Sequence, residues 1–238
     1  MILDFHIHSL FSPDSLSKPK SILNTAKIRG LNGIAITDHN TIRGAIEVKK
    51  INKDRNFLVI VGAEIETEVG DIIGIFLTKE IKSRISFEVI KEIHQQDGIV
   101  ILPHPYKGHQ LSEKLLKSVD IIECYNSRIS KEINNKAFKL AKRYKKPIIA
   151  GSDAHFCCEI GFCKTTYNSR NIREEILEGP KKIEIKYIPI HNSFASQIIK
   201  SFKTKKFSKI PFQGIPFFKH FLKSVKNKPN SFEIYKFT

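Results

Sequence analysis

Short apolar segments alternate along this chain with longer segments whose apolar residues recur at every third or fourth position. The short segments are typical of buried strands and cover residues 2–8, 33–36, 57–61, 99–102, 120–125 and 147–150. The periodic segments between them predict helices over residues 17–29, 41–52, 86–96, 111–118 and 131–144. Residues 65–69 and 71–76 are expected to form a hairpin around Gly70. Such a strand–helix repeat predicts a parallel sheet with right-handed crossovers.

Polar groups with metal-binding chemistry stand at the C-terminal ends of five predicted strands. In the first strand, alternating polar positions put Asp4, His6 and His8 on one face. The later strand ends carry Asp38-His39, Glu64, His104, and Asp153 with His155. Histidine and carboxylate groups are common ligands of divalent metals. Because these groups end several different strands, the pattern favours a barrel with its chemistry at one rim over an open sheet.

The strand–helix repeat weakens beyond about residue 180, where the composition becomes basic. Residues 181–238 contain 13 lysines and two glutamates, and so carry +11 of the net charge of +16. Residues 192–203 and 217–225 are read as short helices. We therefore expect a barrel domain over residues 1–180 and a basic C-terminal extension, residues 181–238, that packs on it. The charge either attracts a polyanion such as nucleic acid or reflects a lysine-rich composition on a solvated surface.

Long apolar segments of the transmembrane kind are absent from the sequence. The polar positions begin at Asp4, where a cleavable signal peptide would have its basic and apolar regions. We therefore expect a soluble, cytoplasmic protein that does not bind membranes.

The order of the polar strand ends resembles the motifs of the PHP (polymerase and histidinol phosphatase) family. The matching motifs are D-x-H-x-H-S at residues 4–9, T-D-H at 37–39, Glu64 after a glycine, H-P at 104–105 and G-S-D-A-H at 151–155. The resemblance extends from residue 2 to about residue 170. It implies an α/β fold, namely a distorted (β/α)7 barrel, with two or three divalent metal ions at the C-terminal strand ends.

Carried over position by position, the resemblance implies three metal subsites. The first ion would take His6, His8, Glu64 and Asp153, the second would share Glu64 and add His104, and the third would take Asp14, His39 and His155. This mixture of imidazole and carboxylate ligands suits zinc, manganese or iron. One position departs from the family pattern, because Asp71 stands where many members have a histidine. We therefore expect the second subsite to differ, in its occupancy or in the metal it prefers, from the subsite of family members that have the histidine.

The resemblance implies hydrolysis of a phosphate ester by a metal-bound hydroxide, with Glu64 and Asp153 holding the ions. Cationic side chains near the strand ends are the candidates for binding the phosphate. Arg128 comes first because its fork can bind two oxygens, and Lys107 and Arg43 follow. Each of these three is alternatively an ordinary surface cation.

Two enzymatic functions are compatible with these motifs. One is a phosphomonoesterase that acts on a small substrate such as a nucleotide or a sugar or amino-alcohol phosphate. The other is a nuclease or nucleotide-oligomer hydrolase that uses the basic C-terminal region. A binding module with a degenerate site is disfavoured, because nearly every ligand position keeps a competent side chain. Loops set the substrate of barrel enzymes, so the motifs identify a reaction class and not a substrate.

Overall fold

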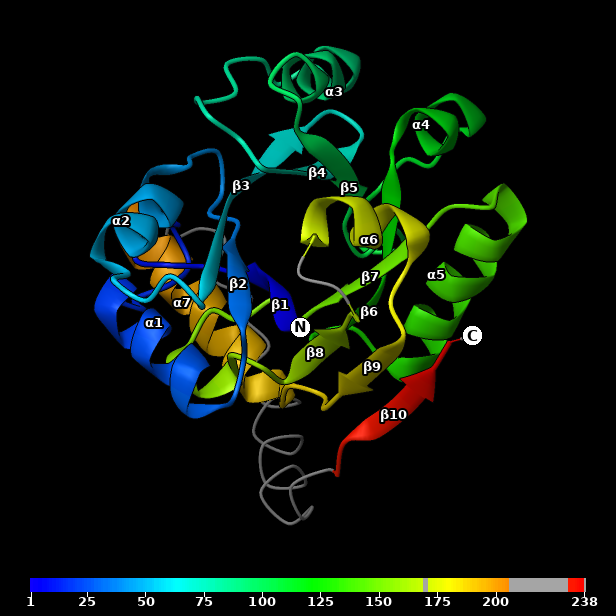
Figure 1. The fold of residues 1–238 in the computed structure, drawn as a ribbon. Helices are drawn as coiled ribbons and strands as arrows, with labels where there is room; N and C mark the ends of the chain where they lie inside the picture. Colours follow the sequence, from blue (N-terminus) through cyan, green and yellow to red (C-terminus); the bar gives the residue numbers. More distant parts are fainter. Residues whose placement is uncertain (169–170, 206–230, 238) are drawn as a thin grey trace.

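A single mixed sheet organises the computed structural model, which describes residues 1–168, 171–205 and 231–237 (Figure 1). Its strands are β1 (Ile2–Ile7), β2 (Gly33–Ile36), β3 (Leu58–Thr67), β4 (Gly70–Ile75), β5 (Ile99–Leu102), β6 (Ile121–Asn126), β7 (Ile148–Gly151), β8 (Cys163–Thr166), β9 (Lys182–Ile185) and β10 (Glu233–Lys236). Across the sheet their order is β10-β9-β8-β1-β2-β3-β4-β5-β6-β7.

Strands β1 to β7 form the barrel. β1, β2 and β3 pair in parallel, as do β5, β6 and β7, whereas β4 is antiparallel to both of its neighbours. A bridge between Ile7 and Ala154 joins the end of β1 to the chain that follows β7. The distorted (β/α)7 barrel expected from the sequence is thus confirmed. Its distortion is the β3–β4 hairpin, which takes the place of a helical crossover.

The predicted hairpin forms, but its turn comes earlier in the sequence than expected. Thr67 pairs with Gly70, so the turn consists of residues 68–69 and β3 is longer than the predicted strand. Gly70 has a φ of 115°, a conformation that residues with a side chain rarely adopt. The longer strand matters for the site because it carries Glu64 in its second half.

Helices cover the outer face of the barrel, as the strand–helix repeat predicts. The covering helices are α1 (Pro19–Ile28), α2 (Arg43–Ile51), α3 (Ser86–His94), α4 (Glu113–Ser118) and α5 (Lys131–Tyr144); α6 (Ile172–Glu178), α7 (Ile190–Thr204) and a 3-10 turn, η1, at Cys157–Glu159 lie elsewhere. The apolar faces of α1 to α5 join one core cluster with the strands, through Ile22, Ala45, Val89, Leu115 and Ala137. A second cluster contains strand residues such as Phe5, Ile60 and Ile101 together with Ile172 and Ile176 of α6. Figure 1 shows α6 in front of the barrel opening, beside the N-terminus.

The sheet continues beyond residue 180. β8 pairs with β1, β9 with β8, and β10 with β9, all antiparallel. The helix expected at residues 192–203 is present within α7, whereas residues 217–225 lie outside the described part of the chain. The domain division at residue 180 stays a prediction. Within the described ranges, no helix has both the length and the apolar character needed to cross a membrane.

Candidate metal centre

The eight side chains predicted to bind metal converge at the C-terminal ends of the barrel strands. His6 belongs to β1 and Glu64 to β3, and the loops after β1, β2, β5 and β7 supply the rest: His8, Asp14, His39, His104, Asp153 and His155. All are buried except His39, which is partly exposed. Parallel strands end at the same edge of a barrel, which is why segments far apart in the sequence meet here.

A first group of donors surrounds one oxygen of Glu64. His6 Nε2 lies 3.4 Å from Glu64 Oε2 and 3.7 Å from Asp153 Oδ1. His8 Nε2 lies 3.4 Å from each of the same two oxygens. Ligands held at about 2.1 Å from one tetrahedral ion are about 3.4 Å from one another. Each of the two imidazoles therefore lies at about the spacing of one coordination sphere from both Glu64 Oε2 and Asp153 Oδ1.

The other oxygen of Glu64 faces a second group. Glu64 Oε1 lies 3.1 Å from His104 Nε2, and Asp71 completes a set of three donor atoms that lie within 4.8 Å of one another. Burial, together with the charge of Glu64, raises the pKa of Asp71 to about 6. The position expected for a histidine is thus filled by a carboxylate that reaches the group. Two carboxylates and one imidazole make this group richer in oxygen than the first.

Asp14, His39 and His155 form a third group. Asp14 Oδ2 lies 3.2 Å from Nε2 of His39 and 3.2 Å from Nε2 of His155. His8 belongs to the same cluster and so borders both the first and the third group. Burial alone would raise the pKa of Asp14, but the imidazoles of His155 and His39 hold it well below its ordinary value. Asp14 therefore stays ionised beside two histidines.

A buried carboxylate that the sequence analysis missed, Glu123, supports the first group from behind. Glu123 Oε1 lies 2.9 Å from Nδ1 of His6, and Glu123 Oε2 accepts a hydrogen bond from the backbone N–H of His104. With Nδ1 directed at Glu123, His6 turns Nε2 toward Glu64 and would offer that nitrogen to a metal ion. A signal was available in the sequence, because Glu123 is the only charged residue inside the apolar strand β6.

The electrostatics of the three groups fit divalent cations. Burial alone would raise the pKa values of Glu64 and Asp153, but the charge of His6 and further neighbouring cations hold both well below their ordinary values. Burial and the nearby His155 lower the pKa of His8 to about 3, so its imidazole stays neutral. Among the described residues, three buried imidazole nitrogens lack a hydrogen-bond partner: His8 Nε2, His39 Nδ1 and His104 Nδ1. Ionised buried carboxylates beside unpartnered imidazole nitrogens are a donor set suited to metal ions.

Comparison with known proteins agrees with this geometry. The model of the PHP domain family matches residues 4–193, which is most of the chain. The chain belongs to the PHP domain family. Two uncharacterized proteins of Methanocaldococcus jannaschii are similar to it. One is 37% identical over 165 residues, covering 58% of this chain and 96% of that protein. The other is 34% identical over 194 residues, covering 76% and 77% respectively.

Solved structures of other PHP-like proteins share the fold. A two-domain protein from Bacteroides vulgatus, described as containing a predicted PHP-like metal-dependent phosphoesterase, matches with a TM-score of 0.62 and 21% identity. The match covers 75% of this chain and 62% of that protein, so this chain spans less than two thirds of it. Endonuclease Q, solved with a 27-mer duplex carrying an abasic lesion, matches with a TM-score of 0.54 and 19% identity, covering 74% of this chain and 56% of that one.

In this PHP domain Arg128, the first candidate for the substrate phosphate, is enclosed by protein groups. Its side chain is 4% exposed, and Nη2 donates to Glu159 Oε2 at 2.7 Å. Nε donates to the carbonyl of Asp153 at 2.6 Å, and Nη1 donates to the hydroxyls of Ser193 and Ser196. These contacts occupy most of the five N–H donors of a guanidinium. They argue for a supporting role beneath Asp153 and against phosphate binding.

The other two cationic candidates differ in their distance from the centre. Lys107 has a side chain that is 54% exposed, and its Nζ lies 3.8 Å from Asp153 Oδ2. Arg43 is exposed at the start of α2, with its guanidinium over the ring of Phe11. Lys107 therefore stands at the rim of the metal groups with donors available to a substrate, whereas the contact described for Arg43 is with Phe11.

Asp4 does not face the metal groups, although strand alternation predicted that it would point the same way as His6 and His8. Its carboxylate accepts hydrogen bonds from the backbone N–H groups of Ser152 and Gly161. The pairing of β1 with β2 shifts register between Asp4 and Ile7, which breaks the simple alternation. Burial raises the pKa of Asp4 to about 6.

Two of the ligand candidates, like several other residues of the described chain, have a left-handed backbone conformation. His104 has a φ of 28° and Asp153 a φ of 54°, both in the left-handed region that side chains usually avoid. Each is held there by contacts described above, since Glu123 accepts from the N–H of His104 and Arg128 donates to the carbonyl of Asp153. Strained residues of this kind often belong to functional sites, where surrounding contacts maintain them.

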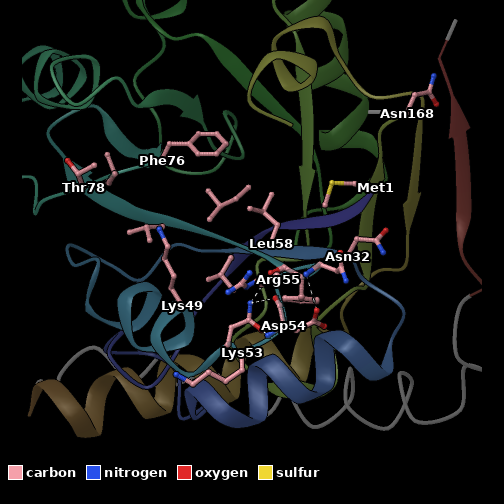
Figure 2. A pocket seen from close by; sticks show the side chains of 17 residues that line it. Met1, Asn32, Lys49, Lys53, Asp54, Arg55, Leu58, Phe76, Thr78 and Asn168 are labelled. Atoms are coloured by element: carbon pink, nitrogen blue, oxygen red, sulfur yellow. Dashed lines mark hydrogen bonds between the residues drawn. The ribbon is translucent and has the colours of Figure 1, made fainter. Parts of the chain in front are cut away.

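A large cavity of the PHP domain lies at the opposite end of the barrel and is distinct from the metal centre. Its volume is about 1040 Å³, and its wall includes residues just before or at the start of three strands, Met1, Asn32 and Leu58. Figure 2 shows Lys53 and Arg55 on one side of it and Phe76 on the other. None of the described lining residues is a histidine. The cavity therefore has neither the location nor the ligands of the candidate metal site.

Proposed function

We propose that this PHP domain is a metal-dependent phosphoric ester hydrolase that acts on a small phosphomonoester, such as a nucleotide or a sugar or amino-alcohol phosphate. The observation that carries the proposal is the position of Glu64, whose two oxygens face two different groups of donors. A carboxylate shared in this way can bridge two ions at the spacing of about 3.5–4 Å that two-metal hydrolysis uses.

The proposed ligands divide among three subsites. His6, His8, Glu64 and Asp153 would hold the first ion, Glu64, His104 and Asp71 the second, and Asp14, His39 and His155 the third. Mixed imidazole and carboxylate ligands suit zinc, manganese or iron, and additional carboxylate shifts the preference toward manganese. We therefore propose two or three divalent ions, with the oxygen-rich second subsite favouring manganese.

The reaction would combine the chemistry of the ions with a framework that the protein prepares in advance. Bound divalent ions supply Lewis acidity and lower the pKa of water for attack on phosphorus. Glu123 orients His6 and anchors the backbone of His104, so two proposed ligands are held before substrate arrives. The exposed ammonium of Lys107 would meet a phosphate oxygen as a point charge. Glu64 and Asp153 would act as catalytic residues by holding the ions.

A substrate screen tests the proposal. Protein purified without chelator and supplied with manganese is incubated with phosphomonoesters, phosphodiesters and short oligonucleotides, and product release is measured. We expect phosphate release from at least one class of small phosphomonoester. Cleavage of oligonucleotides without any activity on monoesters would show that the protein is a nuclease instead. Metal-loaded protein that hydrolyses none of these compounds would contradict the proposal.

One specific feature favours the second candidate, a nuclease or nucleotide-oligomer hydrolase. α7 belongs to the basic region 181–238 and places Lys200 beside the centre, with Nζ 3.4 Å from Glu66 Oε1. Endonuclease Q, which has a similar fold, was solved with duplex DNA at its active site. Lysines along the path of a nucleic acid would bind its phosphates and release counterions, so that affinity falls steeply with salt.

Oligonucleotide binding by the full chain separates the two candidates. The affinity for a fluorescent single strand and a fluorescent duplex is measured at low and at high salt. Binding that weakens with salt, together with cleavage, would support the nuclease. Absence of binding at low salt would leave the +11 charge as a feature of composition and favour the small phosphomonoester.

A further inference from the structure

One lysine of α7 is directed at the loop that carries Asp14. Lys203 Nζ donates to the carbonyl oxygens of Leu10, Ser12 and Ser15 at 2.8, 2.6 and 3.1 Å. An ammonium group has three N–H donors, so all of them can be directed at this one loop. Lys203 lies outside residues 4–193, the span that the PHP domain model matches.

The loop that Lys203 contacts determines where Asp14 lies. Ser12 Oγ donates to Asp14 Oδ1 at 2.7 Å, while Asp14 Oδ2 faces His39 and His155 at 3.2 Å each. On its other side the loop is tied through Ser15 Oγ, which donates to the carbonyl of His155 at 2.7 Å. Asp14 is therefore held between two anchors, one on the barrel and one on α7.

The opposite end of α7 contacts a residue that holds His155, another member of the third group. Asn192 Nδ2 donates to Glu159 Oε1 at 2.8 Å, and Glu159 Oε2 accepts from the backbone N–H of His155, also at 2.8 Å. Arg128, which donates to Glu159, also contacts α7 through Ser196. One helix thus contacts the segments that carry Asp14 and His155. In Figure 1, α7 is drawn on the same side of the barrel as α1, the helix that follows the Asp14 loop.

We infer that Lys203 is a positioning residue of the third subsite, which orders the Asp14 loop so that Asp14, His39 and His155 can share an ion. The inference deepens the proposed function and depends on its third subsite. A cationic ammonium cannot itself bind a metal ion, and its donors are directed at carbonyl groups and not at a substrate. The effect of Lys203 must therefore pass through the loop.

Metal binding by the full chain tests this inference without substrate. Manganese is titrated into metal-free protein by calorimetry, and bound manganese is counted by elemental analysis, for wild type and Lys203→Ala. Alanine is well tolerated in helices, so the variant should keep α7. The matched control is Lys205→Ala. This variant removes the same charge from an exposed side chain two residues further along the chain. Loss of a supporting contact typically weakens metal binding about 10- to 100-fold.

We expect Lys203→Ala to bind one ion more weakly by this factor, or not to bind it, while the remaining ions bind as in wild type. Lys205→Ala should match wild type, and added methylammonium should partly restore the lost ion by filling the space of the missing ammonium. Equal stoichiometry and affinity in Lys203→Ala and wild type would overturn the inference, and so would a wild-type protein that binds only two ions. Because no substrate is involved, the metal-binding result can be interpreted even if the protein is not a phosphomonoesterase.

Discussion

Glu123 Oε1 lies 2.9 Å from Nδ1 of His6, and both side chains are fully buried. The pair joins β6 to β1 and turns Nε2 of His6 toward Glu64. A carboxylate behind a ligating histidine fixes its tautomer and raises its basicity. Glu123 thus supports the proposed metal centre through His6 and the backbone of His104.

Glu123→Gln should weaken metal binding about 10- to 100-fold without unfolding the protein. The amide keeps the size of the carboxylate but brings an NH2 group toward either His6 or the N–H of His104, where an acceptor is needed. Calorimetric titration with manganese measures the effect. Glu113→Gln, at an exposed position paired with Lys117, serves as the control and should bind as wild type does. Unchanged affinity in Glu123→Gln would show that the pair has no role in holding the ion.

Gly151→Ala should displace the same pair by steric conflict. A Cβ at this position would lie 2.3 Å from His6 Cβ and 2.6 Å from Glu123 Oε1, closer than atoms can approach. We expect a loss of about 1–3 kcal/mol in the free energy of unfolding, typical of overpacking, together with reduced metal content. Denaturant unfolding and elemental analysis measure the two effects.

Gly108→Ala provides the comparison for Gly151→Ala. A Cβ on Gly108 meets no described atom within 4 Å, although its φ of 79° carries a backbone cost of about 1–2 kcal/mol. Both variants should therefore be destabilised, but only Gly151→Ala should lose metal. Full metal content in Gly151→Ala would mean that the strands adjust without moving His6.

The purified protein should contain at least two divalent ions per chain, and removing them should destabilise it. An ion present at 100 times its dissociation constant contributes about 2.7 kcal/mol to the free energy of unfolding. For a chain of this size, that corresponds to a fall in Tm of at least about 5 °C on chelation. Elemental analysis and thermal unfolding with and without chelator measure both. One ion or none after reloading with zinc, manganese or iron would exclude the multi-ion cluster.

Glu64→Gln should remove most phosphoesterase activity while leaving the fold intact. Glu64 is 2% exposed and faces both the first and the second group of donors, so its charge is proposed to serve two ions at once. Glutamine has the same shape but lacks that charge. Activity is measured on the substrate identified by the screen, and circular dichroism checks the fold. A fully active variant would refute the bridging assignment.

Arg128→Ala should act mainly on stability, and Lys107→Ala mainly on substrate binding. Removing Arg128 takes away the cationic partner of Glu159, which is fully buried, and breaking such a pair costs about 3–5 kcal/mol. Lys107 is exposed at the rim, so its loss should raise KM and leave the free energy of unfolding nearly unchanged. Denaturant unfolding and steady-state kinetics on both variants separate the roles. A raised KM with unchanged stability in Arg128→Ala would instead support Arg128 as the residue that binds the substrate phosphate.

The barrel and the candidate ligands at its strand ends could be predicted because both follow from local sequence, whereas Asp14 was assigned only by the resemblance to the PHP family. A short apolar run predicts a strand, and the residue that follows it stands at the strand end whatever the rest of the fold does. His39, His104 and Asp153 could therefore be placed at the rim before any tertiary contact was known. Asp71 was placed at the second subsite by resemblance, and the hairpin register brings it within reach of Glu64 and His104.

Only the tertiary structure decided which groups support those ligands. His6 and Glu123 are 117 positions apart, and Lys203 is 193 positions from Leu10, whose carbonyl it contacts. Such pairs depend on strand register and on how a helix packs against the barrel, which the periodicity of a single segment does not specify. The same reason explains Arg128: the sequence indicates a cation after β6, but the packing of α7 and the Glu159 turn encloses it. Local sequence and the family resemblance thus identified the proposed ligands, and long-range packing determined their orientation.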